Sequence, residues 1–188
     1  KTKKGNFAIF TSLIIKEKDK FYNRGVFVYP NSEIKTYDKR KLFSLAKEDL
    51  YFSPGQNSQI VNYLGWNINL QICFDLRFPE ISRNSWEKSN QPAYDLCLYV
   101  ANWPQKRALH WKSLLLARAI ENQSFLVGVN RVGVDGNEHE YSGDSAVISP
   151  QGLYLNESNS GQEITQTVTL YAKDLIEIRE KMNFLKDA

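Results

Sequence analysis

The chain has 188 residues, of which 42% are hydrophobic and 13% aromatic, and such a composition excludes a disordered chain and suits a globular domain with a buried core. A net charge of +3, from 24 basic and 21 acidic residues, favours no nucleic-acid partner. Because no apolar run reaches the roughly 18 residues that a membrane helix needs, we expect no membrane partner. The sequence has no internal repeat or linker, so we expect a single domain over residues 1–188.

Cysteine content and the N-terminal segment bear on the cellular setting. Two cysteines, Cys73 and Cys97, are too few for a disulfide scaffold, so we expect a reducing, cytoplasmic environment. The first fifteen residues are basic and then apolar, as in a signal peptide, but they contain Thr11 and Ser12 and no small-residue cleavage site. We interpret this segment as the beginning of a strand.

The N-terminal half predicts two pairs of strands. Alternating apolar residues on either side of a polar segment indicate a β-hairpin formed by residues 7–16 and 21–29. The expected elements that follow are a short strand at 33–37, an ambiguous segment at 41–51, a turn at 53–56, and strands at 59–63 and 66–74.

Cys73 lies near the end of the last of these strands. From residue 66 to residue 75, apolar side chains alternate with polar ones, and this alternation places Cys73 on the polar face with Asn69 and Gln71. That position weakens the interpretation of Cys73 as a buried structural cysteine, although the residues alone leave both interpretations open. Cys97 lies within an apolar run and is interpreted as structural.

The C-terminal half alternates helices and strands. Pro79 suits the first turn of a helix at 78–88, and apolar residues spaced by four predict a helix at 108–122. The other expected elements are strands at 96–100, 125–134, 145–149 and 163–170, a turn at 135–136, and a helix at 172–182. This alternation predicts an α/β or layered α+β class.

The sequence contains little that supports a metal site or a serine hydrolase. His110 and His139 are the only histidines, and the sequence contains no C-x-x-C pair, H-E-x-x-H helix, phosphate loop or G-x-S-x-G turn. The segment 138–140 could touch a metal, but we expect it to be a solvated hairpin loop, and we expect no metal site. Cys73 remains as a candidate nucleophile, and a reactive thiolate needs a nearby positive charge or base.

A series of short motifs occurs in a fixed order along nearly the whole chain. They are residues 37–43 (YDKRKLF), Glu48 ahead of 53–55 (SPG), 72–79 (ICFDLRFP), 98–104 (LYVANWP), 110–111 (HW), 117–123 (ARAIENQ), 130–133 (NRVG), 143–145 (GDS) and 150–152 (PQG). With these motifs the sequence resembles the carbon–nitrogen hydrolase (nitrilase) superfamily. More closely, it resembles the branch of omega-amidases that act on 2-oxo-acid amides.

The resemblance implies a catalytic role for three positions. Cys73 would attack an amide carbonyl to give a thioester and ammonia. Lys39 would stabilise the tetrahedral oxyanion, and the backbone N–H of Phe74 would be the second oxyanion donor. Lys39 would also favour the thiolate, whereas the residues alone would suggest a solvated lysine in a basic turn.

The resemblance also implies roles in placing the substrate. Glu48 would be the second glutamate of the family, close to the lysine, although a surface charge is equally compatible with its neighbours. Arg77 would meet a substrate carboxylate, for which a planar bidentate donor is suited; the alternative is a salt bridge to Asp75 or Glu80. Trp103 would form a pocket wall or, alternatively, would simply be a core aromatic residue.

One feature of the family pattern is missing from this sequence. The family uses a Glu-Lys-Cys triad, whose glutamate is the general base and lies in an N-terminal segment. Neither Glu17 nor Glu33 matches that position, so we expect the hydrolase domain to be incomplete at its N-terminus and this chain alone to be inactive. Loss of a general base typically costs about 10²–10⁴-fold in rate.

We therefore expect an amidase that hydrolyses the omega-amide of a small 2-oxo dicarboxylic acid without a metal or organic cofactor. The resemblance implies an α-β-β-α sandwich, truncated at the N-terminus, and a homodimer. Three alternatives remain open. They are another amidase or carbamoylase of the superfamily, a catalytically silent binding or assembly module, and a redox-sensing thiol.

Overall fold

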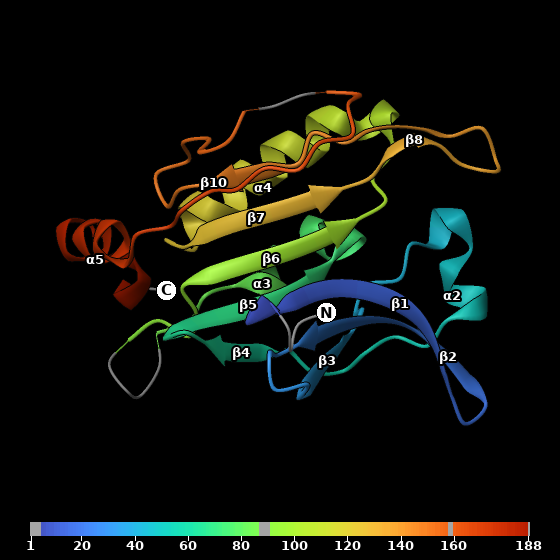
Figure 1. Cartoon of the computed structure of the whole chain (residues 1–188), viewed down its shortest axis with the longest axis horizontal. Helices are drawn as coiled ribbons and strands as arrows, with labels where there is room; N and C mark the ends of the chain where they lie inside the picture. Colours follow the sequence, from blue (N-terminus) through green and yellow to red (C-terminus); the bar gives the residue numbers. More distant parts are fainter. Residues whose placement is uncertain (1–4, 87–90, 158–159, 188) are drawn as a thin grey trace.

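The computed structural model describes residues 5–86, 91–157 and 160–187, which form three β-sheets with helices beside them (Figure 1). The first sheet is antiparallel and has the order β1-β2-β3. Its strands are β1 (Ile9–Glu17), β2 (Lys20–Val28) and β3 (Ile34–Asp38). The predicted hairpin and the short strand after it are confirmed.

The second sheet has the order β10-β7-β6-β5-β4. Its three inner strands are parallel, and its two edge strands pair antiparallel with them. The strands are β4 (Ile60–Tyr63), β5 (Trp66–Ile72), β6 (Leu96–Ala101), β7 (Phe125–Asn130) and β10 (Ala146–Ile148), and the small third sheet pairs β8 (Val132–Val134) with β9 (Glu140–Ser142). The carboxyl ends of β5, β6 and β7 therefore meet at one edge, where loops can gather functional groups.

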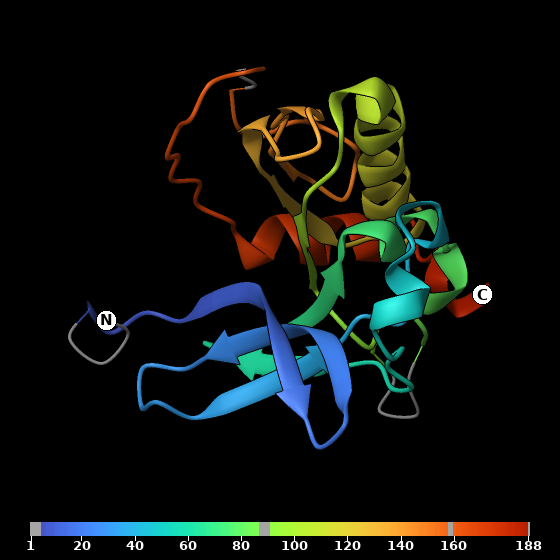
Figure 2. The ribbon, with the colours of Figure 1, turned by 90° about the vertical axis from the view of Figure 1, so that its right-hand side faces the viewer.

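Two hydrophobic clusters hold the layers together. One lies between the sheets and includes Phe27 and Tyr37 from the first sheet and Leu70 and Ile72 from the second. The other joins the second sheet to α4 (Ala108–Glu121) and includes the fully buried Trp111. Figure 2 shows the first sheet on one side of the second sheet and α4 on the other. The chain therefore has a mixed α/β fold, as predicted, and the described residues form a β-β-α arrangement.

β5 is buried on both faces because the first sheet covers one side of the second sheet and α4 lies on the other (Figure 2). The predicted alternation is present, but its polar face is not solvated: Asn69 is 3% exposed and Gln71 is fully buried. Gln71 Nε2 donates to Asn69 Oδ1 at 3.1 Å, and Gln71 Oε1 accepts a hydrogen bond from the Tyr37 hydroxyl at 3.3 Å. Polarity at alternate positions marks a buried hydrogen-bonded face here, because buried polar groups need partners.

The helices differ from prediction mainly around residue 80. The predicted helices at 108–122 and 172–182 are confirmed as α4 and α5 (Ala172–Lys181). The predicted helix at 78–88 is wrong in length: a short helix η2 (Cys73–Arg77) precedes it, and α3 (Pro79–Ser82) has only four residues. Residues 87–88 lie outside the described residues. Other short helices are η1 (Ser44–Ala46), α2 (Glu48–Tyr51), η3 (Gln105–Arg107) and η4 (Phe184–Asp187).

The end of α3 has a clear physical cause. Asn84 is fully buried, and its backbone N–H donates to Asn122 Oδ1 at 2.8 Å while its amide donates to Tyr94 O at 3.0 Å. Because these bonds hold the backbone after Ser82 against α4 and the segment before β6, the chain cannot continue as a helix.

Two predicted strands are also corrected. The strand at 125–134 is interrupted at Arg131, because Asn130 turns its side chain inward to bond the backbone of Trp103. No strand forms at 163–170, where the chain is extended but largely exposed and pairs with no described strand. Among the described residues, no helix has the length and apolar character required to span a bilayer.

Candidate active site

Cys73 lies at the carboxyl end of β5 and begins η2. Its backbone adopts a left-handed conformation, with φ at 46°, which is uncommon for a residue that is not glycine and often marks a functional turn. Its thiol lies 3.8 Å from the backbone oxygen of Asn102, which follows β6. The local backbone thus turns the half-buried side chain away from the strand and over the edge of the second sheet.

Lys39 reaches the same place from the first sheet. It follows β3 and is only 3% exposed. Its ammonium lies 2.6 Å from Glu48 Oε2, and Glu48, the first residue of α2, also accepts hydrogen bonds from the Phe43 N–H at 2.7 Å and the Asn23 amide at 3.1 Å. A buried charge needs such partners. The structure therefore brings Glu48 to Lys39, as the family resemblance implied, and Glu48 is not a free surface charge.

The charges of this pair set the protonation of the site. Burial tends to raise the pKa of the Glu48 carboxyl, but the Lys39 ammonium and the donated hydrogen bonds outweigh it, so that the pKa lies below its ordinary value. Burial raises the pKa of the Cys73 thiol, and the Lys39 charge acts against that rise. Lys39 is thus the group that favours the thiolate, which is the nucleophilic form.

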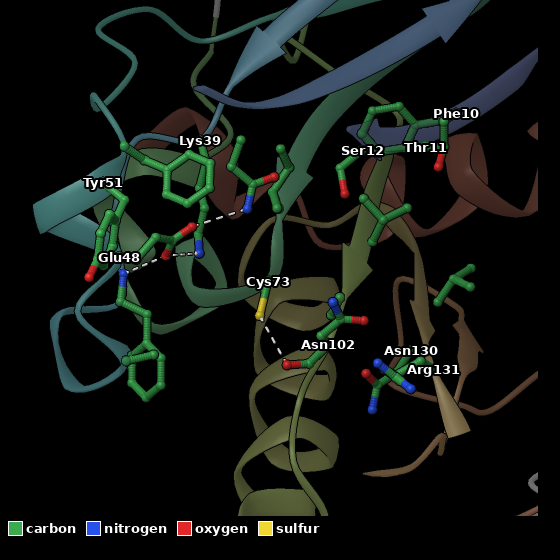
Figure 3. A pocket seen from close by; sticks show the side chains of 18 residues that line it. Phe10, Thr11, Ser12, Lys39, Glu48, Tyr51, Cys73, Asn102, Asn130 and Arg131 are labelled. Carbon is green, nitrogen blue, oxygen red and sulfur yellow. Dashed lines mark hydrogen bonds and ion pairs between the residues drawn. The ribbon is translucent and has the colours of Figure 1, made fainter. Parts of the chain in front are cut away.

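A cavity of about 670 Å³ opens over these side chains. In Figure 3, Lys39 and Glu48 lie on one side of Cys73, and Asn130 and Arg131 lie on the other. Glu48 is the one carboxylate among the described residues that line the cavity. The cavity is large enough for a small organic substrate beside the thiol.

Asp75 is a structural residue of the site that sequence reasoning did not single out. It is fully buried, and its carboxylate accepts hydrogen bonds from the Tyr37 hydroxyl at 2.8 Å, the Lys41 N–H at 2.9 Å and the Ile72 N–H at 3.1 Å. These donors belong to β3, to the segment after Lys39 and to the end of β5. One carboxylate thus ties the turn that carries Cys73 to the segment that carries the lysine.

Phe74 follows Cys73 within the first turn of η2. Backbone N–H groups in a first helical turn have no partner inside the helix, so the Phe74 N–H can donate to an oxyanion at Cys73. Its ring packs against Phe43, with 4.8 Å between the ring centroids, and against Phe78 at 5.2 Å. These contacts fix the position of the backbone next to the thiol.

Arg77 does not line the large cavity. It lines a smaller one, of about 30 Å³, together with Cys73 and Trp103. Its guanidinium lies 4.8 Å from the Trp103 ring, and one of its nitrogens lies 3.1 Å from His110 Nδ1. The alternative of a salt bridge to Asp75 or Glu80 is wrong, because Arg77 makes no ion pair with the described residues.

Trp103 is both a cavity wall and a core residue. It is 3% exposed, and its ring centroid lies 5.5 Å from that of Trp111. Its indole N–H donates to the Arg107 backbone oxygen at 2.8 Å, so the ring is held in place by a hydrogen bond as well as by packing. The two interpretations from sequence therefore apply together.

The other candidates lie apart from this chemistry. Cys97 is buried in the cluster under α4, and burial raises the pKa of its thiol. In the loop at 138–140, the His139 N–H donates to Asp135 at 3.0 Å. Within residues 5–86, 91–157 and 160–187, no group of three or more histidine, cysteine, aspartate or glutamate side chains is arranged to hold a metal ion.

A family model for carbon-nitrogen hydrolases matches residues 2–180. This chain belongs to the carbon-nitrogen hydrolase family. It is similar to the omega-amidase YafV of Escherichia coli (strain K12), with 43% identity over 188 residues that cover 100% of this chain and 71% of that protein. It is also similar to the 2-oxoglutaramate amidase of Bacillus subtilis (strain 168), with 32% identity over 98% of this chain and 70% of that protein.

A solved structure of the family closely matches the fold. XC1258 from Xanthomonas campestris, a CN-hydrolase superfamily protein with an arsenic adduct in its active site, superposes with a TM-score of 0.95 at 42% identity. The match covers 97% of this chain and 69% of that one. The predicted family, its α/β class and its assignment as an enzyme that hydrolyses carbon–nitrogen bonds in amides are therefore confirmed.

Proposed function

We propose that this enzyme hydrolyses the omega-amide of a small 2-oxo dicarboxylic acid through a thioester on Cys73. The observation that carries the proposal is the meeting of the Cys73 thiol with the buried Lys39–Glu48 pair in one cavity. The relatives that are an omega-amidase and a 2-oxoglutaramate amidase support the substrate class.

The chemistry follows from the positions of the charges. The Cys73 thiolate attacks the amide carbonyl carbon, a C–S bond forms, and the carbonyl oxygen becomes an oxyanion. The Lys39 ammonium and the Phe74 N–H stabilise that oxyanion, and such preorganised donors are typically worth about 3–4 kcal/mol of barrier each. As the C–N bond breaks, the nitrogen takes up the proton that the Cys73 thiol lost on forming the thiolate and leaves as ammonia. Water then hydrolyses the thioester, which gives the free acid and restores the thiol.

Glu48 acts in this scheme through Lys39. Its carboxylate holds the ammonium at 2.6 Å, and the bonds from Phe43 and Asn23 fix the carboxylate in turn. A lysine side chain has several rotatable bonds, so this chain of contacts preorganises the positive charge before the substrate binds.

Arg77 is the proposed partner of the substrate carboxylate. Its guanidinium has no carboxylate partner among the described residues, and it lines the small cavity that also touches Cys73. A planar guanidinium binds a carboxylate with two parallel hydrogen bonds. A short dicarboxylic monoamide could therefore place its acid group at Arg77 and its amide at the thiol.

The test is ammonia release by the protein that carries this chain, with a 2-oxo dicarboxylic acid monoamide and a neutral amide of equal length. Arg77→Ala should raise KM for the acidic amide by about 10–100-fold, because a charge-assisted hydrogen-bond pair is lost, and should leave the neutral amide little changed. Arg83→Ala is the matched control, since Arg83 is exposed. An equal loss with the neutral amide would contradict the carboxylate role.

The test also separates the other candidate functions. A carbamoylase would release carbon dioxide together with ammonia from an N-carbamoyl amino acid. A binding module or a redox-sensing thiol would release no ammonia from any amide, even where Cys73 is readily alkylated. Preferential turnover of the acidic amide supports the proposal against all three.

A further inference from the structure

Two guanidinium groups share the small cavity beside Cys73. Arg77 reaches it from η2, and Arg107 reaches it from the end of η3. The cavity measures about 30 Å³, somewhat more than the roughly 10–15 Å³ that one water molecule needs on the same measure. It can therefore take one small polar group of a ligand, and the rest of that ligand must lie elsewhere.

Neither guanidinium is neutralised by the described residues. Arg77 contacts the Trp103 ring at 4.8 Å and His110 at 3.1 Å, and Arg107 lies over the Phe43 ring at 5.2 Å. The described lining of the cavity contains no carboxylate. Like charges repel, and the repulsion is stronger where water is partly excluded, so an anion that binds between the two guanidinium groups would stabilise this arrangement.

A hydrogen bond to His110 orients the Arg77 side chain. An arginine can only donate hydrogen bonds, so His110 Nδ1 accepts and its ring proton lies on Nε2. An imidazole side chain carries no negative charge, so this contact leaves the guanidinium charge of Arg77 uncompensated. Burial, and after it the charge of Arg107, lowers the pKa of the Arg77 guanidinium, which indicates that the two positive charges act on each other.

The two cavities meet at the nucleophile. Cys73, Phe43 and Asn102 line both the large cavity and the small one. A ligand that fills the small cavity with one end therefore has its next atoms beside the thiol. This fits a short substrate whose acid group and scissile amide are separated by a few carbons.

We propose that Arg107 is a specificity-determining residue that binds the substrate carboxylate together with Arg77. This inference rests on the proposed function, because it assigns a second arginine to the same substrate group. Two guanidinium groups offer parallel N–H pairs to the two carboxylate oxygens. The flanking rings of Phe43 and Trp103 exclude water and strengthen those bonds.

The test compares Arg107→Gln with the control variant Lys106→Gln. Lys106 is the neighbouring residue of η3 and lines neither of these two cavities. Arg107→Gln should raise KM for an acidic amide by about 10–100-fold and should change kcat/KM for a neutral amide less than about twofold. Lys106→Gln should leave both unchanged. The bond from the Trp103 indole to the Arg107 backbone oxygen does not depend on the side chain, so the fold should persist.

A second readout does not depend on turnover. Calorimetry with a short 2-oxo dicarboxylate should show binding that weakens about 10–100-fold in Arg107→Gln and less in Arg107→Lys, which keeps the charge but loses the planar fork. If Arg107→Gln leaves this binding unchanged, or weakens acidic and neutral amides equally, the inference is overturned.

The two readouts keep this failure distinct from failure of the proposed function. If the wild-type protein does not hydrolyse acidic amides, but the dicarboxylate still binds through Arg107, the proposed substrate is wrong and the carboxylate site stands. If Arg77→Ala impairs acidic amides and Arg107→Gln does not, the proposed function stands and Arg107 has no part in it.

Discussion

Substitution of Asp75 by asparagine should change how the stability of the protein depends on pH. Asp75 is fully buried, and burial raises the pKa of its carboxyl from 3.8 to about 6, although the hydrogen bonds from Lys41, Tyr37 and Ile72 favour the ionised form. Since the folded-state pKa lies above the unfolded value, the folded protein binds this proton more tightly. The resulting stabilisation is fully present below pH 3.8 and is lost as the pH rises through about 6.

The magnitude follows from the two pKa values. Their difference corresponds to about 3 kcal/mol of folding free energy in total. When the pH falls from 8 to 5, the free energy of unfolding rises by about 1.4 kcal/mol of this total. Asparagine does not titrate, so Asp75→Asn lacks this contribution. The variant also places an amide group near one of the donors, and an unsatisfied buried N–H costs about 1–3 kcal/mol at every pH.

The assay is urea denaturation of the wild-type protein and of Asp75→Asn at pH 5 and pH 8. The difference in free energy of unfolding, wild type minus variant, should be about 1.4 kcal/mol larger at pH 5 than at pH 8. Taking the difference between the two proteins cancels every other titrating group that they share. A difference that is the same at both pH values would refute the account of Asp75 as a buried carboxyl with a raised pKa.

Two further predictions concern the lysine and its partner. Glu48→Gln should lower the free energy of unfolding by up to about 3–5 kcal/mol, because it leaves the Lys39 ammonium buried without a carboxylate. Since the pKa of Glu48 is lowered in the folded protein, this loss of stability should shrink as the pH falls below 4.5. Denaturation of both proteins at two pH values would check it. Lys39→Met should slow alkylation of Cys73 by iodoacetamide at fixed pH, because the charge that favours the thiolate is removed. Lys41→Met, whose lysine pairs with a surface glutamate, should alkylate at the wild-type rate, and equal rates for both variants would contradict the role of Lys39.

Local patterns predicted the elements that depend mainly on their own sequence. The hairpin at β1 and β2 and the amphipathic α4 were predicted close to their observed bounds, because period 2 and period 3.6 follow from which face is buried. The segment at 163–170 shows the opposite case: its residues favour a strand, but it pairs with no described strand. Strand formation needs a partner, and a partner is not visible in a local pattern.

The site was predicted only as far as its motifs reach. The contact between Lys39 and Glu48 was expected only from the family resemblance. The two residues are nine positions apart and come together through the turn into α2, which no local pattern predicts. The network around Asp75 was not foreseen, because its donors lie up to 38 positions away. One signal was present in the sequence: an acidic residue within a strand-end motif, which is rarely left buried without donors.

The most direct test of the central claim is the turnover number of Cys73→Ala for ammonia release from an acidic omega-amide. Alanine removes only the sulfur, and the residue is held by the backbone of β5 and η2, so the melting temperature should stay close to that of the wild type. Removal of a nucleophile typically lowers kcat by roughly 10⁴–10⁶-fold, and we predict a loss of that size. A folded Cys73→Ala protein that releases ammonia within about tenfold of the wild-type rate would contradict the assignment of Cys73 as the nucleophile.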